Sequence, residues 1–158
     1  MSSCKADSTH VVSTFNTPAG WLCVTHDEHH VHRAVFTQTP GFVQSHGLMA
    51  QFILNQLRIF NKNPQHTFQL PLKPQGTLYQ LRVWNALLAI PAGHPVTYGD
   101  LARVLKSAAR AIGQACKRNP IALFIPCHRV VGQKNLGGYM GHLDLPYKTA
   151  LLQHEFIS

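Results

Sequence analysis

The protein is a chain of 158 residues in which 14 lysines and arginines stand against only 6 aspartates and glutamates, so the formal net charge is +8 without the 11 histidines. Hydrophobic residues make up 45% of the chain, which excludes a disordered basic tail and allows one sizeable core or two small ones. The longest apolar runs are far shorter than the roughly 18 to 20 residues of a membrane span, and the first ten residues lack the apolar segment of a signal peptide. We therefore expect a folded, cytoplasmic protein with no membrane partner.

The first third of the chain is typical of an antiparallel sheet. Runs rich in β-branched and aromatic residues occur at residues 11–15, 21–25 and 31–36, and the turn Thr17–Gly20 and the polar stretch His26–His30 separate them. These runs predict three strands.

A helix and a connector are predicted next. Apolar residues recur at helical spacing over about Gly47–Phe60. Three prolines within residues 61–76 then indicate a connector. We place a domain boundary near Gly76, which divides the chain into residues 1–76 and 77–158.

Three short helices are predicted after the connector. Thr77 is a suitable N-cap for a helix that runs through Ala89. Thr97 and Asp100 have the spacing of a capping box for a second helix, and Ser107 can cap a third at once.

The third of these helices has two unlike faces. Its expected buried face consists of Ala108, Ala109, Ile112, Ala115 and Cys116. Its polar face consists of Arg110, Gln114, Lys117 and Arg118. Two short helices joined by a tight turn, the second cationic on its outside, are typical of a helix-turn-helix. Helical hairpins that bind nothing share this pattern, so both interpretations stay open.

Residues 101–143 carry the most uneven charge in the chain. This stretch has seven basic residues and no acid, whereas residues 1–76 have five basic residues and three acids. A solvated basic face is one interpretation, and a polyanionic partner, most often nucleic acid, is the other. The seven are Arg103, Lys106, Arg110, Lys117, Arg118, Arg129 and Lys134.

Cys127 follows an apolar run and Pro126, and His128 follows Cys127. Four cysteines scattered along a chain that is not secreted are expected to stay reduced, so free thiols are available. A cysteine of ordinary pKa, about 8.5, is mostly protonated at neutral pH, so a nucleophile needs a base or a positive charge nearby. His128 could serve through a bridging water, because adjacent side chains diverge. A buried structural cysteine beside a surface histidine is the alternative.

A last helix is predicted over Pro146–Glu155, and its spacing places Glu155 on the same apolar face as Leu151. A carboxylate on that face needs a partner. Contact with His128 would satisfy it, fix the imidazole tautomer and support thiolate formation. An exposed Glu155 at a frayed C-terminus is the alternative.

The segment Ile125-Pro126-Cys127-His128-Arg129-Val130 resembles the alkyl-acceptor motif of the O6-alkylguanine-DNA alkyltransferases, also called methylated-DNA–protein-cysteine methyltransferases. Residues 77–155 resemble the DNA-binding and active-site domain of this family nearly throughout. Further matching segments are Val96–Ala102, Ala108–Gly113, Asn119-Pro120 and Leu136–Tyr139, with Thr17–Gly20 and Phe68–Pro71 in the more variable N-terminal domain.

The resemblance implies an α+β fold in two parts. The N-terminal part would be a small antiparallel sheet with a helix, ribonuclease H-like in arrangement. The C-terminal part would be an all-α domain with a winged-type helix-turn-helix.

The resemblance also implies an activity: DNA repair by direct, irreversible transfer of the alkyl group of O6-alkylguanine, or of O4-alkylthymine, in duplex DNA to Cys127. Each molecule would react once, as a monomer and without a cofactor. His128 would act as the base, Glu155 would orient it, and Asn119 would be the hinge before the active-site segment.

The DNA contacts follow from the same resemblance. Arg110 matches the arginine that replaces the extruded base in the stack, and Tyr98 matches the tyrosine that crowds the target phosphate. The small residues Ala109 and Gly113 would permit close approach to the minor groove. The other expected DNA-binding residues are Gln114, Lys117 and Arg118, and the base-binding positions are Tyr139, Val130 and Met140.

Some positions depart from the family. Met140 stands where many members have serine, and Ala122 where some have a proline beside the alkyl group. Some members bind zinc in the N-terminal domain through cysteines and histidines. The spacing of the candidates here, which are Cys4, Cys23, His26, His29, His30 and His32, does not reproduce a metal pattern, so we expect a histidine-rich solvated turn and no metal, with a structural zinc as the alternative.

Three other functions compete with alkyl transfer. An alkyltransferase-like protein binds lesions without transfer, and it carries another residue, often tryptophan, at the position of Cys127. A helix-turn-helix regulator would not need Cys127, His128 and Glu155. A cysteine hydrolase would turn over repeatedly.

Overall fold

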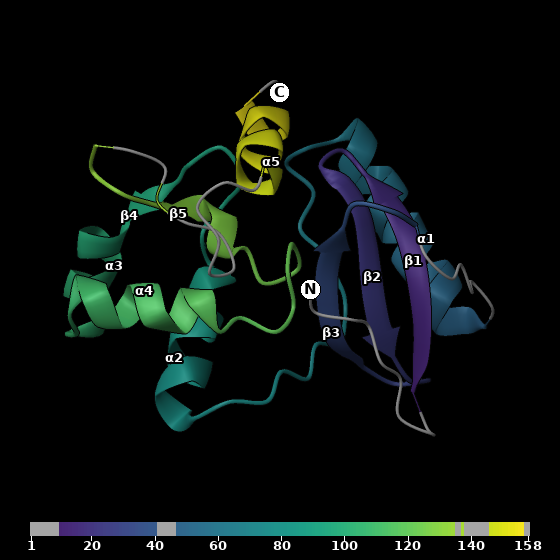
Figure 1. The fold of residues 1–158 in the computed structure, drawn as a ribbon, viewed down its shortest axis with the longest axis horizontal. Helices are drawn as coiled ribbons and strands as arrows, with labels where there is room; N and C mark the ends of the chain where they lie inside the picture. The colour runs from purple at the N-terminus through teal and green to yellow at the C-terminus, as the bar shows by residue number, and fades with distance from the viewer. Residues whose placement is uncertain (1–9, 41–46, 135–136, 138–145, 157–158) are drawn as a thin grey trace.

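The computed structural model describes residues 10–40, 47–134, 137 and 146–156. Its N-terminal half contains the three predicted strands, β1 (Val11–Thr17), β2 (Gly20–His26) and β3 (Val31–Thr37), which form an antiparallel sheet in the order β1-β2-β3 (Figure 1). Thr17 closes the first hairpin, because its hydroxyl accepts the N–H of Ala19 at 3.2 Å and donates to the carbonyl of Gly20 at 2.7 Å.

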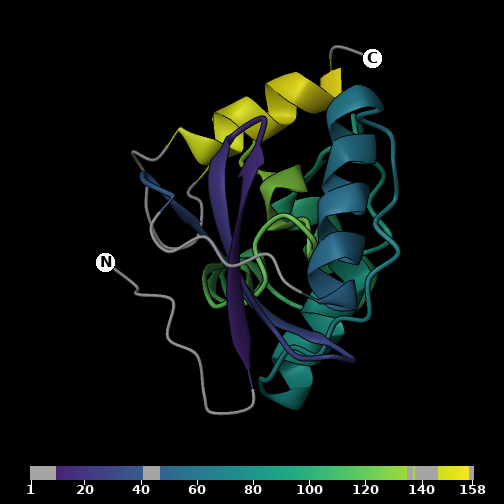
Figure 2. The same cartoon turned by 90° about the vertical axis from the view of Figure 1, so that its right-hand side faces the viewer.

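Helix α1 (Leu48–Lys62) lies along the sheet, as Figure 2 shows. Its buried side chains recur at helical spacing and are Ala50, Ile53, Gln56, Leu57 and Phe60. The predicted helix is therefore present, two residues longer at its C-terminal end.

The outer edge of β3 connects the two halves of the chain. The N–H of Val31 donates to the carbonyl of Pro71 in the connector at 2.8 Å, and the N–H of Ala34 donates to the carbonyl of Pro120 at 3.0 Å. The edge strand is thus covered by two later segments rather than left open. One continuous cluster of buried side chains extends from Phe15 to Leu151. The division at Gly76 stays a prediction.

The C-terminal half is mainly helical. It consists of α2 (Leu78–Leu87), α3 (Tyr98–Leu105), α4 (Ala109–Lys117), a 3-10 turn η1 (Cys127–Arg129) and α5 (Tyr147–Phe156). The expectation of an all-α domain is wrong, because β4 (Val96–Thr97) and β5 (Val130–Val131) form a two-stranded parallel sheet. This ladder ties the start of α3 to the segment that follows Cys127.

Side-chain caps fix the residues at which α2 and α3 begin. Thr77 and Gln80 form a complete capping box at α2, and the hydroxyl of Thr97 accepts the N–H of Asp100 at α3. Ser107 does not cap α4 as predicted, because its hydroxyl is bonded to that of Tyr79 at 2.6 Å and Ala108 takes the N-cap position without a side-chain bond.

The helices α3 and α4 pack against each other, and Lys106, in the left-handed conformation at φ 53°, turns the chain between them. Ile112, Ala115 and Cys116 form the buried face of α4. Ala108 and Ala109 are exposed, so their expected burial is wrong. Among the described residues, every helix is too short or too polar to cross a bilayer.

Candidate active site

The loop in front of Cys127 is held by Asn119, which is buried. The side-chain amide of Asn119 donates to the carbonyl of Ile125 at 2.9 Å, and its oxygen accepts the N–H of Ile121 at 3.0 Å. Between these anchors Leu123 has a φ of 69°, in a region that residues other than glycine rarely adopt. Asn119 therefore fixes a tight loop that delivers the chain to Pro126 and Cys127.

Cys127 begins the 3-10 turn η1 and is 4% exposed. Burial raises the pKa of its thiol to about 11, although a hydrogen bond with the Asn119 side chain and the charge of Lys148 act in the opposite direction. At that pKa only about one thiol in 10⁴ is ionised at pH 7. The resting thiol is therefore protonated, and its reaction requires a group that accepts the proton.

His128 and Glu155 are in direct contact, as the sequence predicted. The Nε2 of His128 lies 2.7 Å from Oε1 of Glu155, and both side chains are fully buried. Because an ionised carboxylate only accepts hydrogen bonds, Nε2 carries the proton and Nδ1 of the neutral ring holds a lone pair. Burial lowers the pKa of His128, and Nδ1 has no partner within the described part of the chain. The ring is thus a neutral base with one free acceptor.

Arg129 is the third member of this cluster. We counted it among the cations of a basic face, but it is 8% exposed and its Nε donates to both oxygens of Glu155 at 3.0 Å. Its Nη1 donates to the carbonyl of Ile90 at 2.7 Å. Burial alone would raise the pKa of Glu155, but the hydrogen bonds from His128 and Arg129 lower it. Glu155 therefore stays ionised.

Lys148 is a second cation that the sequence did not single out. It is 3% exposed, and its Nζ donates to the carbonyl of Val130 at 2.7 Å and lies 3.5 Å from the hydroxyl of Tyr98. Burial raises the pKa of Tyr98 to about 12, so the phenol is protonated at neutral pH. The one signal for Lys148 in the sequence is its position on the apolar face of α5, where a lysine needs a polar partner.

The expected DNA-binding residues of α4 share one outer face. Arg110, Gln114, Lys117 and Arg118 are exposed, as is Ala109, while Gly113 is partly buried. A Cβ added to Gly113 would meet no atom within 4 Å, so the residue leaves open space on the helix surface. This face of α4 is free to approach a partner closely.

The base-binding positions are only partly described. Tyr139 and Met140 lie outside the described residues. Val130 is buried, its N–H donates to the carbonyl of Cys127, and its own carbonyl accepts the ammonium of Lys148.

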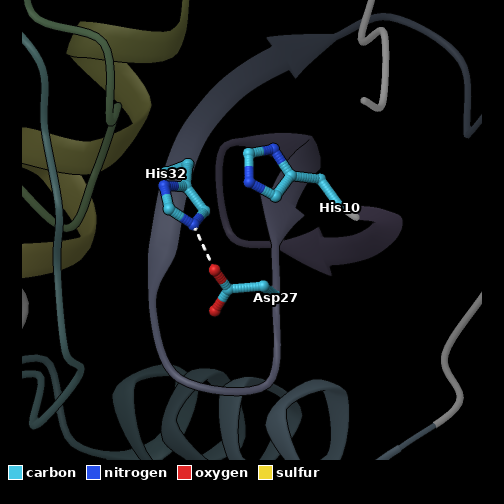
Figure 3. A group of neighbouring side chains, drawn as sticks. All are labelled: His10, Asp27 and His32. Carbon is cyan, nitrogen blue, oxygen red and sulfur yellow. Dashed lines mark hydrogen bonds and ion pairs between the residues drawn. The ribbon is translucent and has the colours of Figure 1, made fainter. Parts of the chain in front are cut away.

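The cysteines and histidines of the N-terminal half are arranged differently from the expectation. Cys23 is disulfide-bonded, so the prediction that all thiols are reduced is wrong there, whereas Cys116 and Cys127 are free. His10, Asp27 and His32 instead bring three potential metal-ligand atoms within 4.8 Å of one another (Figure 3). Only His32 of this group was among the candidates named from the sequence.

Comparison with known proteins places the chain in a family. Residues 78–157 match the family described as "6-O-methylguanine DNA methyltransferase, DNA binding domain". Over 92% of its length the chain is 34% identical to the constitutive methylated-DNA–protein-cysteine methyltransferase of Bacillus subtilis, 95% of which is covered. The chain belongs to the methylated-DNA–protein-cysteine methyltransferase family. A second relative is the methylated-DNA–protein-cysteine methyltransferase of Methanosarcina mazei. It is 45% identical over a stretch that covers 65% of this chain and 66% of the relative.

The fold of this methyltransferase is similar to that of a solved relative. The crystal structure of Mycobacterium tuberculosis OGT in complex with DNA superimposes with a TM-score of 0.79 at 32% identity and covers 92% of each chain. The similarity confirms the predicted α+β fold.

Proposed function

We propose that this methyltransferase repairs duplex DNA by moving the alkyl group of O6-alkylguanine to the Sγ of Cys127 in one irreversible event. One observation carries the proposal. Arg129 contacts Glu155, Glu155 contacts His128, and His128 directly follows the buried thiol of Cys127. This arrangement supplies a neutral base near a thiol that is almost wholly protonated at neutral pH.

The transfer is a direct displacement. The thiol proton moves, through a bridging water, to the free Nδ1 of His128, and Sγ attacks the O6-bound carbon. The S–C bond forms as the C–O6 bond breaks, and the departing guanine is protonated as His128 returns to its neutral form. Because the resulting thioether has no easy leaving group, Cys127 is not regenerated.

We infer that α3 and α4 act as a winged-type helix-turn-helix whose second helix enters the minor groove, and that the N-terminal sheet with α1 is ribonuclease H-like. The exposed face of α4 supports this assignment, since it is cationic at Arg110, Lys117 and Arg118 and small at Ala109 and Gly113. Arg110 would stack in the space left by the extruded base, and Tyr98 would crowd the target phosphate. The protein acts as a monomer, with O4-alkylthymine as a second substrate.

The test is a duplex that contains O6-methylguanine, followed by digestion of the protein and mass measurement of its peptides. We expect one added methyl group on the peptide with Cys127, saturation at one per chain, and no product with Cys127→Ala. Repeated turnover would indicate a hydrolase, and lesion binding with unmodified Cys127 would indicate a lesion-binding protein. Either result, or DNA binding alone, would refute the proposal.

The base-extrusion role of Arg110 is tested separately. Arg110→Ala should slow repair of duplex DNA much more than reaction with the free base O6-methylguanine, because only the duplex reaction requires unstacking. Lys134→Ala, at another exposed cation of the same stretch, is the matched control. Equal losses with duplex and free base would contradict the role of Arg110.

A further inference from the structure

The C-terminal half contains a second buried thiol that the alkyl-transfer mechanism does not use. Cys116 lies in the last turn of α4, and Cys127 begins η1. The two residues are 6% and 4% exposed, neither is disulfide-bonded, and both belong to the continuous cluster of buried side chains. The role of Cys116 therefore depends on how near it lies to the nucleophile.

Asn119 contacts both cysteines. Its backbone N–H donates to the carbonyl of Cys116 at 3.2 Å, and its side chain is hydrogen-bonded to the thiol of Cys127. The same side chain donates to the carbonyl of Ile125 at 2.9 Å, which also accepts the N–H of Cys127 at 2.8 Å. One residue thus spans the space between the end of α4 and the start of η1.

Lys148 acts on both thiols. Burial raises the pKa of Cys116 to about 12, with the charge of Cys127 as the second cause, whereas the positive charge of Lys148 lowers it. The same ammonium acts against burial at Cys127. Because charges act strongly only over short distances, the two thiols and Nζ of Lys148 share one small region of the core. The ammonium would stabilise whichever thiol loses its proton.

A peroxide can replace the alkyl group as the electrophile at Cys127. Hydrogen peroxide is smaller than an alkylated base, so a site that admits the base also admits the oxidant. The thiol proton moves through a water to Nδ1 of His128, and Sγ attacks one peroxide oxygen. The S–O bond forms as the O–O bond breaks, and the departing hydroxide takes the proton from His128 and leaves as water. The sulfur is oxidised to a sulfenic acid and the peroxide is reduced.

The sulfenic acid has two possible fates. A second peroxide would convert it to a sulfinic acid, which thiol reductants do not reverse. Alternatively, Sγ of Cys116 attacks the sulfenic sulfur, so that the S–S bond forms as the S–O bond breaks. The departing hydroxide takes the thiol proton of Cys116 and leaves as a second water. The nearness of Cys116 favours this second fate, because it makes the attack intramolecular.

We propose that Cys116 is the resolving thiol of Cys127, and that peroxide converts the pair to a disulfide within one chain. The bond requires Cα atoms within about 7 Å of each other, which the shared contacts with Asn119 favour. This inference rests on the proposed acceptor role of Cys127 and goes beyond it. Because each acceptor is used once, a disulfide that a reductant reopens preserves it, whereas a sulfinic acid would destroy it.

The first test exposes the 158-residue chain to a small molar excess of hydrogen peroxide and digests it with trypsin without reductant. Trypsin cleaves after lysine and arginine, so Cys116 falls on peptide 111–117 and Cys127 on peptide 119–129. We expect the two peptides to be joined, lighter than their sum by two hydrogen atoms, from a chain that still migrates as a monomer on a non-reducing gel.

The second test uses Cys116→Ser. Before oxidation this variant should transfer the alkyl group at the normal rate. After peroxide and then dithiothreitol, it should recover at least about tenfold less activity than the unaltered protein, because Cys127 proceeds to the sulfinic acid and gains two oxygen atoms. Cys127→Ala is the matched control. Its peptide 111–117 should stay unmodified, since Cys127 is the thiol that reacts first.

Three results would overturn the proposal. They are a sulfinic acid on Cys127 of the unaltered protein without joined peptides, a cross-link between two chains, and equal recovery in Cys116→Ser and the unaltered protein. The joined peptides are measured on the unaltered protein, so this readout does not depend on the folding of a variant. Alkyl transfer by the unoxidised protein is measured in parallel, so failure of the disulfide and failure of the proposed repair activity are distinguishable.

Discussion

The described part of the chain contains two histidine–carboxylate pairs with the same contact and opposite surroundings. Nε2 of His128 lies 2.7 Å from Glu155, and Nε2 of His32 lies 2.7 Å from Asp27. The first pair is fully buried, whereas the side chains of the second are 16% and 28% exposed. Distance alone therefore does not distinguish the buried pair, proposed above as catalytic, from the surface pair.

The partners of the carboxylate make the difference. Glu155 is shared between His128 and the guanidinium of Arg129, so all three buried groups depend on one another. Asp27 is held by two backbone N–H groups and faces water on one side. The buried pair can fix one tautomer of its histidine, while the exposed pair can exchange its proton with solvent.

The largest expected effect is that of Glu155→Gln on stability. It leaves the charge of Arg129 buried without its partner, and removal of one member of a buried ion pair costs about 3–5 kcal/mol. Urea unfolding measures the loss. Asp27→Asn, the corresponding change in the exposed pair, should lower the urea midpoint much less, because solvent screens an exposed pair. A similar loss in both variants would show that burial does not separate the pairs.

His128→Gln should have the next largest effect, on the rate of alkyl transfer. Loss of a general base typically slows a reaction by about 10²–10⁴-fold, and we expect a slowing in this range. Single-turnover kinetics with a methylated duplex measures the rate. His32→Gln should react at the normal rate, and a comparable slowing there would refute the assignment of His128 as the base.

Arg129→Lys should have an intermediate effect on stability. A lysine has one ammonium group and cannot bond both oxygens of Glu155 while reaching the carbonyl of Ile90, so about 1–3 kcal/mol should be lost. Arg103→Lys is the control, since Arg103 pairs with Asp100 on the exposed surface. Equal unfolding midpoints in the two variants would contradict the role given to Arg129.

The pH dependence of stability should show the smallest effect. Because burial lowers the pKa of His128 below 6.5, the unfolded chain binds an extra proton below that pH, and stability falls as the pH decreases through this window. The lowered pKa of Glu155 adds a further loss below about 4.5. Urea midpoints between pH 7 and 5 should therefore decline less in His128→Gln than in His32→Gln. Parallel profiles would contradict this origin of the decline.

Local rules predicted much of the fold. The three strands, helix α1 and the caps at Thr77 and Thr97 follow from residue type and spacing over a few positions. The predictions failed where a residue distant in sequence bonded to the group in question. Ser107 bonds Tyr79 instead of capping α4, and β4 pairs with β5 across more than thirty residues of chain.

The sequence by itself determined the chemistry available: a cysteine followed by a histidine, a carboxylate on the apolar face of the last helix, and a second helix with a cationic outer face. Only the tertiary structure decided which charges are used and how. It buried Arg129 beside Glu155, placed Nζ of Lys148 3.5 Å from the hydroxyl of Tyr98, and brought His10, Asp27 and His32 together. Residue type sets what a side chain can donate or accept, but burial and partners from distant segments set its pKa and the role open to it.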